Sequence, residues 1–209
     1  MSGKTRGKVF GTRQIATTGI LAAVATVLFA FVPSIPVVPN IYNLDFSNIP
    51  VMLGGFAMGP IPGLVILLIK DVVHFLIRGL SETVGVGDIA DFITCASFML
   101  PAAIMYQRKR TLKTAMTGMV VGMVLVTVIS VFLNKWFLFP TFSRLIPYMT
   151  LEKIVETIGK VFPFADTEWK ALLLVTAPFN LIKSIMIMVV TFFIYKPLSP
   201  ILKGNWGRR

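Results

Sequence analysis

Long apolar segments divide this sequence, and the last of them, residues 171–195, is long enough to cross a lipid bilayer. A transmembrane helix needs about 20 predominantly apolar residues. Hydrophobic residues make up 56% of the chain and charged residues only 14%. This balance is typical of a membrane protein with several spans and excludes an ordinary soluble domain. We therefore predict an all-α membrane protein.

The apolar segments predict six transmembrane helices in one compact bundle, which forms a single domain over residues 1–209. The predicted helices are, approximately, residues 15–32, 49–58, 60–77, 88–106, 115–139 and 171–195. The second segment is too short to span a bilayer fully, and Gly59-Pro60 ends it. Three prolines exclude a regular helix over residues 33–48, which we expect to form a structured extracellular loop.

Lys and Arg residues gather in three segments that contain no Asp or Glu. Residues 1–14, the connection 108–113 and the C-terminal tail each carry four of them. The positive-inside rule places all three segments, and therefore both termini, in the cytoplasm, which six passes satisfy. The connections predicted to face outside are residues 33–48, 79–87 and 140–170. The net charge of +11 is thus explained by membrane topology, and we expect no nucleic-acid partner.

Two polar residues, Asn180 and Lys183, lie one helical turn apart near the middle of the last apolar segment. A Lys at the bilayer centre costs about 2.5–3.5 kcal/mol on insertion scales. Neither interface is close enough for easy snorkelling, so we expect both side chains to face the protein interior or a polar cavity. The predicted topology places Asp45, Asp91 and Asn134 on or near the outer side, above this pair. We therefore predict a pocket that opens outward and binds a small polar-aromatic ligand.

An enzyme site is the main alternative. Asp71 and His74 are three residues apart on a predicted helix and therefore share a face. An acid–base pair is conceivable, but no nucleophile lies beside it, and a buried polar network is the simpler interpretation. The single Cys and single His argue against a metal site, so we predict none. No complete phosphate-binding loop is present, so we predict that the chain is not an ATPase and not an enzyme.

A strip of small residues, Gly19 and Ala23, lies on the first predicted helix, with Thr18 and Ala22 beside it. Small residues at this spacing let another helix approach closely. The strip serves either packing inside the bundle or contact with a partner protein. The sequence leaves both interpretations open.

Three groups of residues resemble the substrate-binding S-components of energy-coupling-factor (ECF) vitamin transporters. They are Leu44-Asp45-Phe46-Ser47-Asn48-Ile49-Pro50 with Gly59-Pro60 and Gly63, Leu133-Asn134 with Phe139-Pro140, and Pro178-Phe179-Asn180-Leu181-Ile182-Lys183. The resemblance extends from about Ile15 to Leu202 and is strongest to riboflavin-binding S-components.

This resemblance implies a subunit that captures riboflavin from outside a bacterial cell membrane with high affinity. It needs no cofactor of its own and passes the vitamin on with a separate transmembrane coupling protein and two ATPases. The implied ligand-binding residues are Tyr42, Leu44, Asp45, Asp91, Asn134, Asn180 and Lys183, and the implied coupling-protein contacts are Gly19 and Ala23. Other vitamins or flavin analogues, and a purely structural membrane protein, remain alternatives.

Asp71 and Asp91 depart from the family pattern, which usually has Asn at these places. An ionised carboxylate accepts hydrogen bonds but donates none. Either the ligand differs slightly from riboflavin, or these acids pair with Lys70, Lys183 or a protonated partner.

Overall fold

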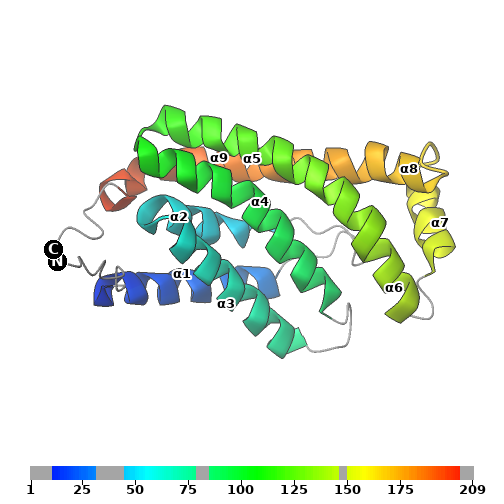
Figure 1. Ribbon diagram of the computed structural model, residues 1–209, viewed down its shortest axis with the longest axis horizontal. Helices are drawn as coiled ribbons and strands as arrows, with labels where there is room; N and C mark the ends of the chain where they lie inside the picture. Colours follow the sequence, from blue (N-terminus) through cyan, green and yellow to red (C-terminus); the bar gives the residue numbers. More distant parts are fainter. Residues whose placement is uncertain (1–10, 32–44, 79–84, 146–149, 203–209) are drawn as a thin grey trace, which may run out of the picture.

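The computed structural model describes residues 11–31, 45–78, 85–145 and 150–202, and every regular element within them is helical. Figure 1 shows the arrangement. The elements are α1 (Thr12–Ala30), α2 (Asn48–Met58), α3 (Pro60–Arg78), α4 (Val86–Arg108), α5 (Leu112–Leu133), η1 (Asn134–Leu138), α6 (Phe139–Leu145), α7 (Leu151–Val161), α8 (Glu168–Ala171), η2 (Leu172–Thr176) and α9 (Ala177–Leu202). The predicted all-α class is confirmed for these residues.

Five helical runs are long and apolar enough to cross a membrane. They are Thr12–Ala30, Pro60–Ile77, Val86–Arg108, Leu112–Leu145 and Glu168–Ile194. The short helix α2 has only 11 residues and does not reach this length. The described residues therefore contain five helices of full spanning length, and the prediction that the second apolar segment is too short to span a bilayer fully is confirmed.

Helix α2 lies inside the bundle, where it contacts α1, α3, α4 and α9. The side chains of Val51, Met52 and Phe56 are completely buried. A helix that is apolar on all sides is stable only when it is buried on all sides. Gly59 ends α2 with φ of 111°, a conformation that favours glycine, and Pro60 begins α3 directly after it.

Helices α4 and α5 pack closely because glycines line their interface. A Cβ atom added at Gly118 would lie 2.7 Å from the Cα of Ala102, and one at Gly122 would overlap the carbonyl oxygen of Phe98. Two glycines four residues apart on one helix let a second backbone approach closely. The two helices pack against each other more extensively than any other pair of described elements.

We expect Gly118→Ala to lower the free energy of unfolding by about 1–3 kcal/mol, because the added methyl group meets backbone atoms of α4 that side-chain rotation cannot move. Thermal unfolding in detergent can be followed with a thiol-reactive dye, since the only cysteine, Cys95, is buried. Gly19→Ala is the matched control: nothing lies within 4 Å of an added Cβ there, so stability should stay equal or rise. Equal melting of the two variants would contradict this packing argument.

The fifth predicted helix was expected to end at residue 139, but the helical run continues through Pro140 to Leu145. A π-helical turn, η1, makes this continuation easier. The N–H of Phe139 donates to the carbonyl of Asn134, five residues back, just before the proline that lacks an N–H. Turn η2 precedes Pro178 in the same way, with the N–H of Ala177 donating to the carbonyl of Leu172.

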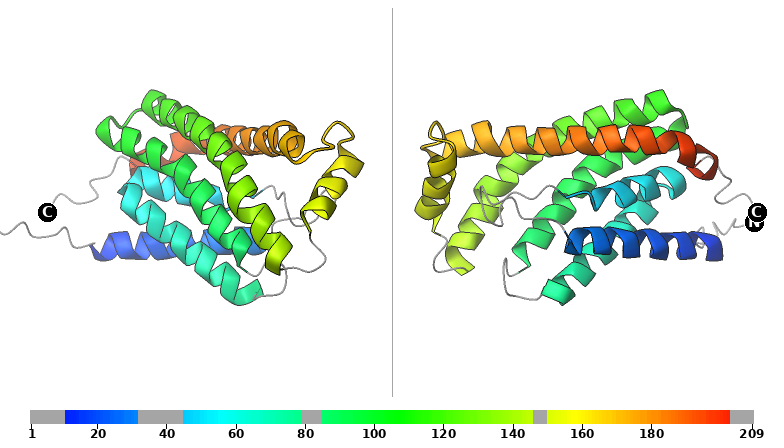
Figure 2. Two further views of the ribbon diagram at one scale, coloured as in Figure 1. Left: turned by 45° about the vertical axis from the view of Figure 1, so that its right-hand side comes forward. Right: turned by 180° about the vertical axis from the view of Figure 1, so that it is seen from behind.

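The bundle has two distinct ends. Helix α1 begins, α4 passes into α5, and α9 ends at one end, whereas α6, α7 and α8 lie at the other (Figure 1). The views in Figure 2 show the same separation, with α1 and α9 running in opposite directions. Helix α7 is amphipathic, and it buries Ile154 and Ile158 against its neighbours.

Candidate functional site

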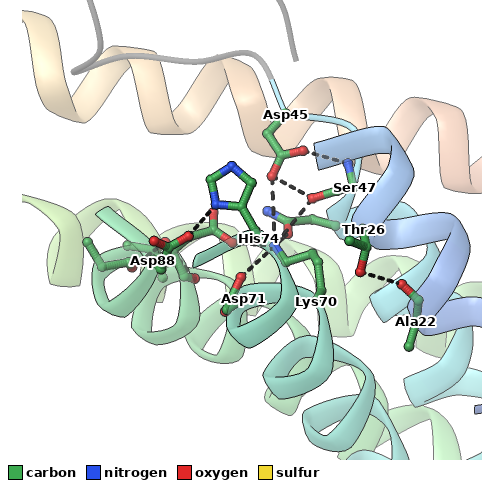
Figure 3. A network of polar contacts seen from close by, with 12 residues as sticks. Ala22, Thr26, Asp45, Ser47, Lys70, Asp71, His74 and Asp88 are labelled. Carbon is green, nitrogen blue, oxygen red and sulfur yellow. Dashed lines mark hydrogen bonds and ion pairs between the residues drawn. The ribbon is translucent and has the colours of Figure 1, made fainter. Parts of the chain in front are cut away.

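The ammonium group of Lys70, on α3, lies at the centre of a buried polar network (Figure 3). Its side chain is fully buried, with 0% exposure. Three carboxylates surround the Nζ atom: those of Asp91 at 2.5 Å, Asp71 at 3.2 Å and Asp45 at 3.9 Å. Nζ also donates to Ser47 Oγ and Asn48 Oδ1, each at 3.2 Å. A charge in such a place is tolerated only when it is paired and hydrogen-bonded.

The segment that enters α2 is shaped by Asp45. Its carboxylate accepts hydrogen bonds from the backbone N–H and the hydroxyl of Ser47, both at 2.7 Å. Short polar side chains that bond the backbone two residues on are typical of Asx turns. This turn presents Ser47 Oγ and Asn48 Oδ1 to Lys70. Asp45 therefore supports the network in two ways, by fixing the turn and by its negative charge.

Asp91 connects Lys70 to Lys183. One carboxylate oxygen lies 2.5 Å from Lys70 Nζ, and the other lies 3.6 Å from Lys183 Nζ. The unusual acids Asp71 and Asp91 therefore pair with lysines, as one of the two sequence-based alternatives expected. This chain of ion pairs joins α3, α4 and α9 across the bundle.

His74 pairs with Asp88 rather than with Asp71. Its Nδ1 lies 2.5 Å from the Asp88 carboxylate, and its ring stacks on Phe29 of α1 with centroids 3.9 Å apart. Lys70 Nζ lies 4.3 Å from the centroid of the same Phe29 ring. The predicted polar network on this helix is present, but it holds α1 against α3 and α4 and forms no Asp71–His74 acid–base pair.

Asn180 and Lys183 line a cavity of about 20 Å³ between α2, α4, α5 and α9. Asn48, Thr94, Cys95 and Ser184 contribute to the same wall. A space of this size holds about one water molecule. The prediction that Asn180 and Lys183 face a polar cavity therefore agrees with the geometry, although a whole aromatic ligand does not fit in it.

Asn134 lies elsewhere, at the first position of η1, and only 7% of the residue is exposed. Its amide Nδ2 donates to the carbonyl of Ser130 at 2.8 Å. The next residue, Lys135, pairs with Glu168 at 2.7 Å and lies over the ring of Trp169. These contacts hold η1 beside α8, close to the start of the last long helix.

Comparison with protein families identifies the family of this chain. Residues 13–195 match the family described as "ECF transporter, substrate-specific component". The chain belongs to this family.

Sequence and structure alignments with similar proteins extend over nearly the whole of this chain. The riboflavin transporter RibU of Staphylococcus aureus (strain TCH60) is 30% identical over 97% of this chain and 99% of its own length. The riboflavin transporter FmnP of Bacillus subtilis (strain 168) is 26% identical over 90% of this chain and 93% of its own length. A solved structure described as "Structure and mechanism of the S component of a bacterial ECF transporter" aligns with a TM-score of 0.68 and 31% identity, covering 92% of this chain and 98% of that one.

An S-component is a transport subunit and not an enzyme, and it lies in a membrane. The enzyme alternative based on Asp71 and His74 is therefore not favoured, in agreement with the pairing of His74 to Asp88.

The small-residue strip on α1 of the S-component faces away from the bundle. Gly19 and Ala23 are exposed, whereas Thr18 and Ala22 beside them are buried. No atom lies within 4 Å of a Cβ added at Gly19. Packing inside the bundle is therefore the role of Thr18 and Ala22, and the interpretation of Gly19 and Ala23 as internal packing residues is wrong.

Two of the predicted ligand-binding residues, Tyr42 and Leu44, lie outside the described residues. The others fall into an ionic group (Asp45, Asp91, Lys183), a cavity residue next to it (Asn180) and a separate residue on η1 (Asn134). Sequence reasoning left Lys70 out of the site. The rule that drew attention to Lys183, an ionisable residue inside an apolar helix, applies equally to Lys70.

Proposed function

We propose that this S-component binds riboflavin from the outside and hands it to the rest of an ECF transporter in a bacterial cell membrane. The observation that carries the proposal is the full-length similarity to proteins named as riboflavin transporters, at 30% identity for the Staphylococcus aureus relative. Riboflavin is itself amphipathic, with an apolar ring system, a uracil-like edge and a hydroxylated tail. A site with apolar walls and a few fixed polar groups suits such a ligand.

The polar groups proposed to contact the ligand are Asn134, Asn180 and Lys183, with Tyr42 and Leu44 beside the ring. Asn180 and Lys183 offer an amide and an ammonium group to one cavity. We assign Asp45 and Asp91 an indirect role in this site, because their carboxylates are already engaged by Ser47, Lys70 and Lys183.

We also propose six passes, with α2 as a short second pass and both termini in the cytoplasm. Helices α1 and α3 start at the same end of the bundle (Figure 1). The chain therefore has to cross back once, between the end of α1 and the start of α3, and α2 is the proposed crossing. The Lys/Arg-rich connection 108–113 lies at this end as well, together with the start of α1 and the end of α9. The positive-inside rule assigns that end to the cytoplasm.

The exposed strip of Gly19 and Ala23 is the proposed contact with the transmembrane coupling protein, which works with two ATPases. We expect Gly19→Leu to leave riboflavin affinity within about two-fold and to reduce uptake by at least about ten-fold, because a bulky side chain keeps a second helix from approaching. Uptake of labelled riboflavin by cells that contain the complete transporter measures this. Wild-type uptake by the Gly19→Leu variant would show that the strip does not contact the coupling protein.

The proposed ligand is tested on the purified protein. The S-component is prepared in detergent, its absorbance spectrum is recorded, and riboflavin is titrated while flavin fluorescence is followed. A copurified yellow chromophore or saturable quenching supports the proposal. A colourless protein without quenching refutes riboflavin as the ligand, and a screen of other vitamins and flavin analogues then identifies the substrate.

A further inference from the structure

Asn48 occupies an unusual position for a residue with no assigned role. It is the first residue of α2 and only 4% exposed, and it lines the same cavity as Asn180 and Lys183. Buried amide groups are normally hydrogen-bonded at both their oxygen and their nitrogen. The direction in which this amide points therefore decides what it offers to the cavity.

Lys70 fixes the direction of the Asn48 amide. An ammonium group has only donors, so the atom of Asn48 that lies 3.2 Å from Lys70 Nζ has to be the oxygen Oδ1. The Nδ2 group is thereby left as the part of the side chain available to the cavity. Asp91 and Asp71 hold Lys70 in place. The orientation of the Asn48 amide is therefore fixed by residues that do not line the cavity.

The amide of Asn180 points the opposite way. Its Nδ2 donates to the backbone carbonyl of Thr176 at 3.0 Å, and a carbonyl can only accept. The oxygen of Asn180 is therefore the atom left for a ligand. Asn48 and Lys183 therefore offer donors to the cavity and Asn180 offers an acceptor, beside the hydroxyl groups of Thr94 and Ser184 on the same wall.

We propose that Asn48 is a further ligand-contacting residue that donates its amide N–H to a carbonyl oxygen of the ligand, and that Lys70 is the positioning residue that fixes this donor. The partner is the edge of an imide, which presents acceptor, donor and acceptor in sequence. The uracil-like edge of riboflavin has this pattern, so the inference rests on the proposed function and specifies which part of the ligand enters first. A space the size of one water molecule accommodates such a carbonyl tip, while the ring system lies farther out.

Two variants of Asn48 separate donation to the ligand from a purely structural role. Asn48→Asp keeps the shape and the oxygen that Lys70 needs, but it replaces the donor with a second acceptor. We expect riboflavin to bind about 10- to 100-fold more weakly, since the loss of one hydrogen bond leaves a ligand carbonyl facing a carboxylate oxygen. Asn48→Ala removes the donor without adding charge and should weaken binding about ten-fold.

A spectroscopic measurement reports the contact itself. In infrared difference spectra, the carbonyl band of bound riboflavin should move to higher frequency in Asn48→Ala than in the wild type, because a carbonyl that loses a donor becomes stiffer. Ser97→Ala is the control. It removes the hydroxyl of a half-buried residue of α4, but Ser97 lies outside the polar network and does not line the cavity, so its affinity should stay within about two-fold and its carbonyl band should not move.

The outcomes are distinct. Weakened binding by both Asn48 variants together with the shifted band in Asn48→Ala supports the inference. Wild-type affinity and an unshifted band in Asn48→Ala overturn it while riboflavin binding stands. If the wild type itself does not bind riboflavin, the proposed function fails, and this inference falls with it. Melting temperatures show whether a variant has failed to fold. If one Asn48 variant does not fold, the riboflavin affinity of the other tests the inference.

Discussion

Replacement of Lys70 by Met is expected to lower the free energy of unfolding by about 3–5 kcal/mol, the range for removing one partner of a buried ion pair. Lys70 Nζ lies within 4.0 Å of the carboxylates of Asp45, Asp71 and Asp91. Without the ammonium these three acids lie close together, and among the described residues Lys183 is the cation that still pairs with Asp91. Thermal unfolding in detergent, followed by the reactivity of Cys95, measures the loss.

Lys113→Met provides the matched control for Lys70→Met, because Lys113 is exposed on α5. Its stability should stay within about 0.5 kcal/mol of the wild type. The double variant Lys70→Met/Asp91→Asn should recover part of the stability lost by Lys70→Met, since one uncompensated carboxylate is gone. A Lys70→Met protein that melts like the wild type would show that the network does not stabilise the bundle.

Lys183→Met should weaken riboflavin binding by about 10- to 150-fold. This range corresponds to the roughly 1.5–3 kcal/mol of a hydrogen bond donated by a charged group. Stability should fall much less than with Lys70→Met, because Asp91 keeps its closer partner Lys70 at 2.5 Å, whereas Lys183 lies at 3.6 Å. Fluorescence titration and the melting temperature, measured on the same sample, separate the two effects.

The control for Lys183→Met is Lys170→Met, which removes the same charge from an exposed pair with Asp166. Exposed ion pairs contribute about 0–1 kcal/mol, so both affinity and stability should remain close to the wild type. If Lys183→Met binds riboflavin as tightly as Lys170→Met does, Lys183 is a structural residue and not part of the ligand site.

Hydropathy alone predicted the helical class and the positions of the long segments. It also drew attention to Asn180 and Lys183, because a polar pair in the middle of an apolar run needs an explanation. It did not predict that the fifth helix continues past Pro140, since the π turn that accommodates this proline has no simple pattern in sequence. The same limit applies to η2, before Pro178.

The sequence identified the polar residues inside the bundle, but it did not predict which of them pair with each other. The sequence placed Asp71 beside His74 by helical spacing, yet His74 pairs with Asp88 from the next helix. Pairing across helices depends on how each helix is rotated about its axis, and packing against neighbours sets that rotation. The exposure of Gly19 beside the buried Thr18 follows from the same rotation of α1.

The sequence by itself determined that this chain is a bundle of apolar helices with rare polar residues inside, because apolar length and charge bias are properties of each segment alone. Only the tertiary structure decided that Lys70 is the centre of the network and that Asn48 turns its amide nitrogen away from it. Those two features depend on atoms from α2, α3 and α4 meeting within hydrogen-bonding distance. No single segment contains that information, because each ammonium, carboxylate and amide acquires its role from the groups that packing brings to it.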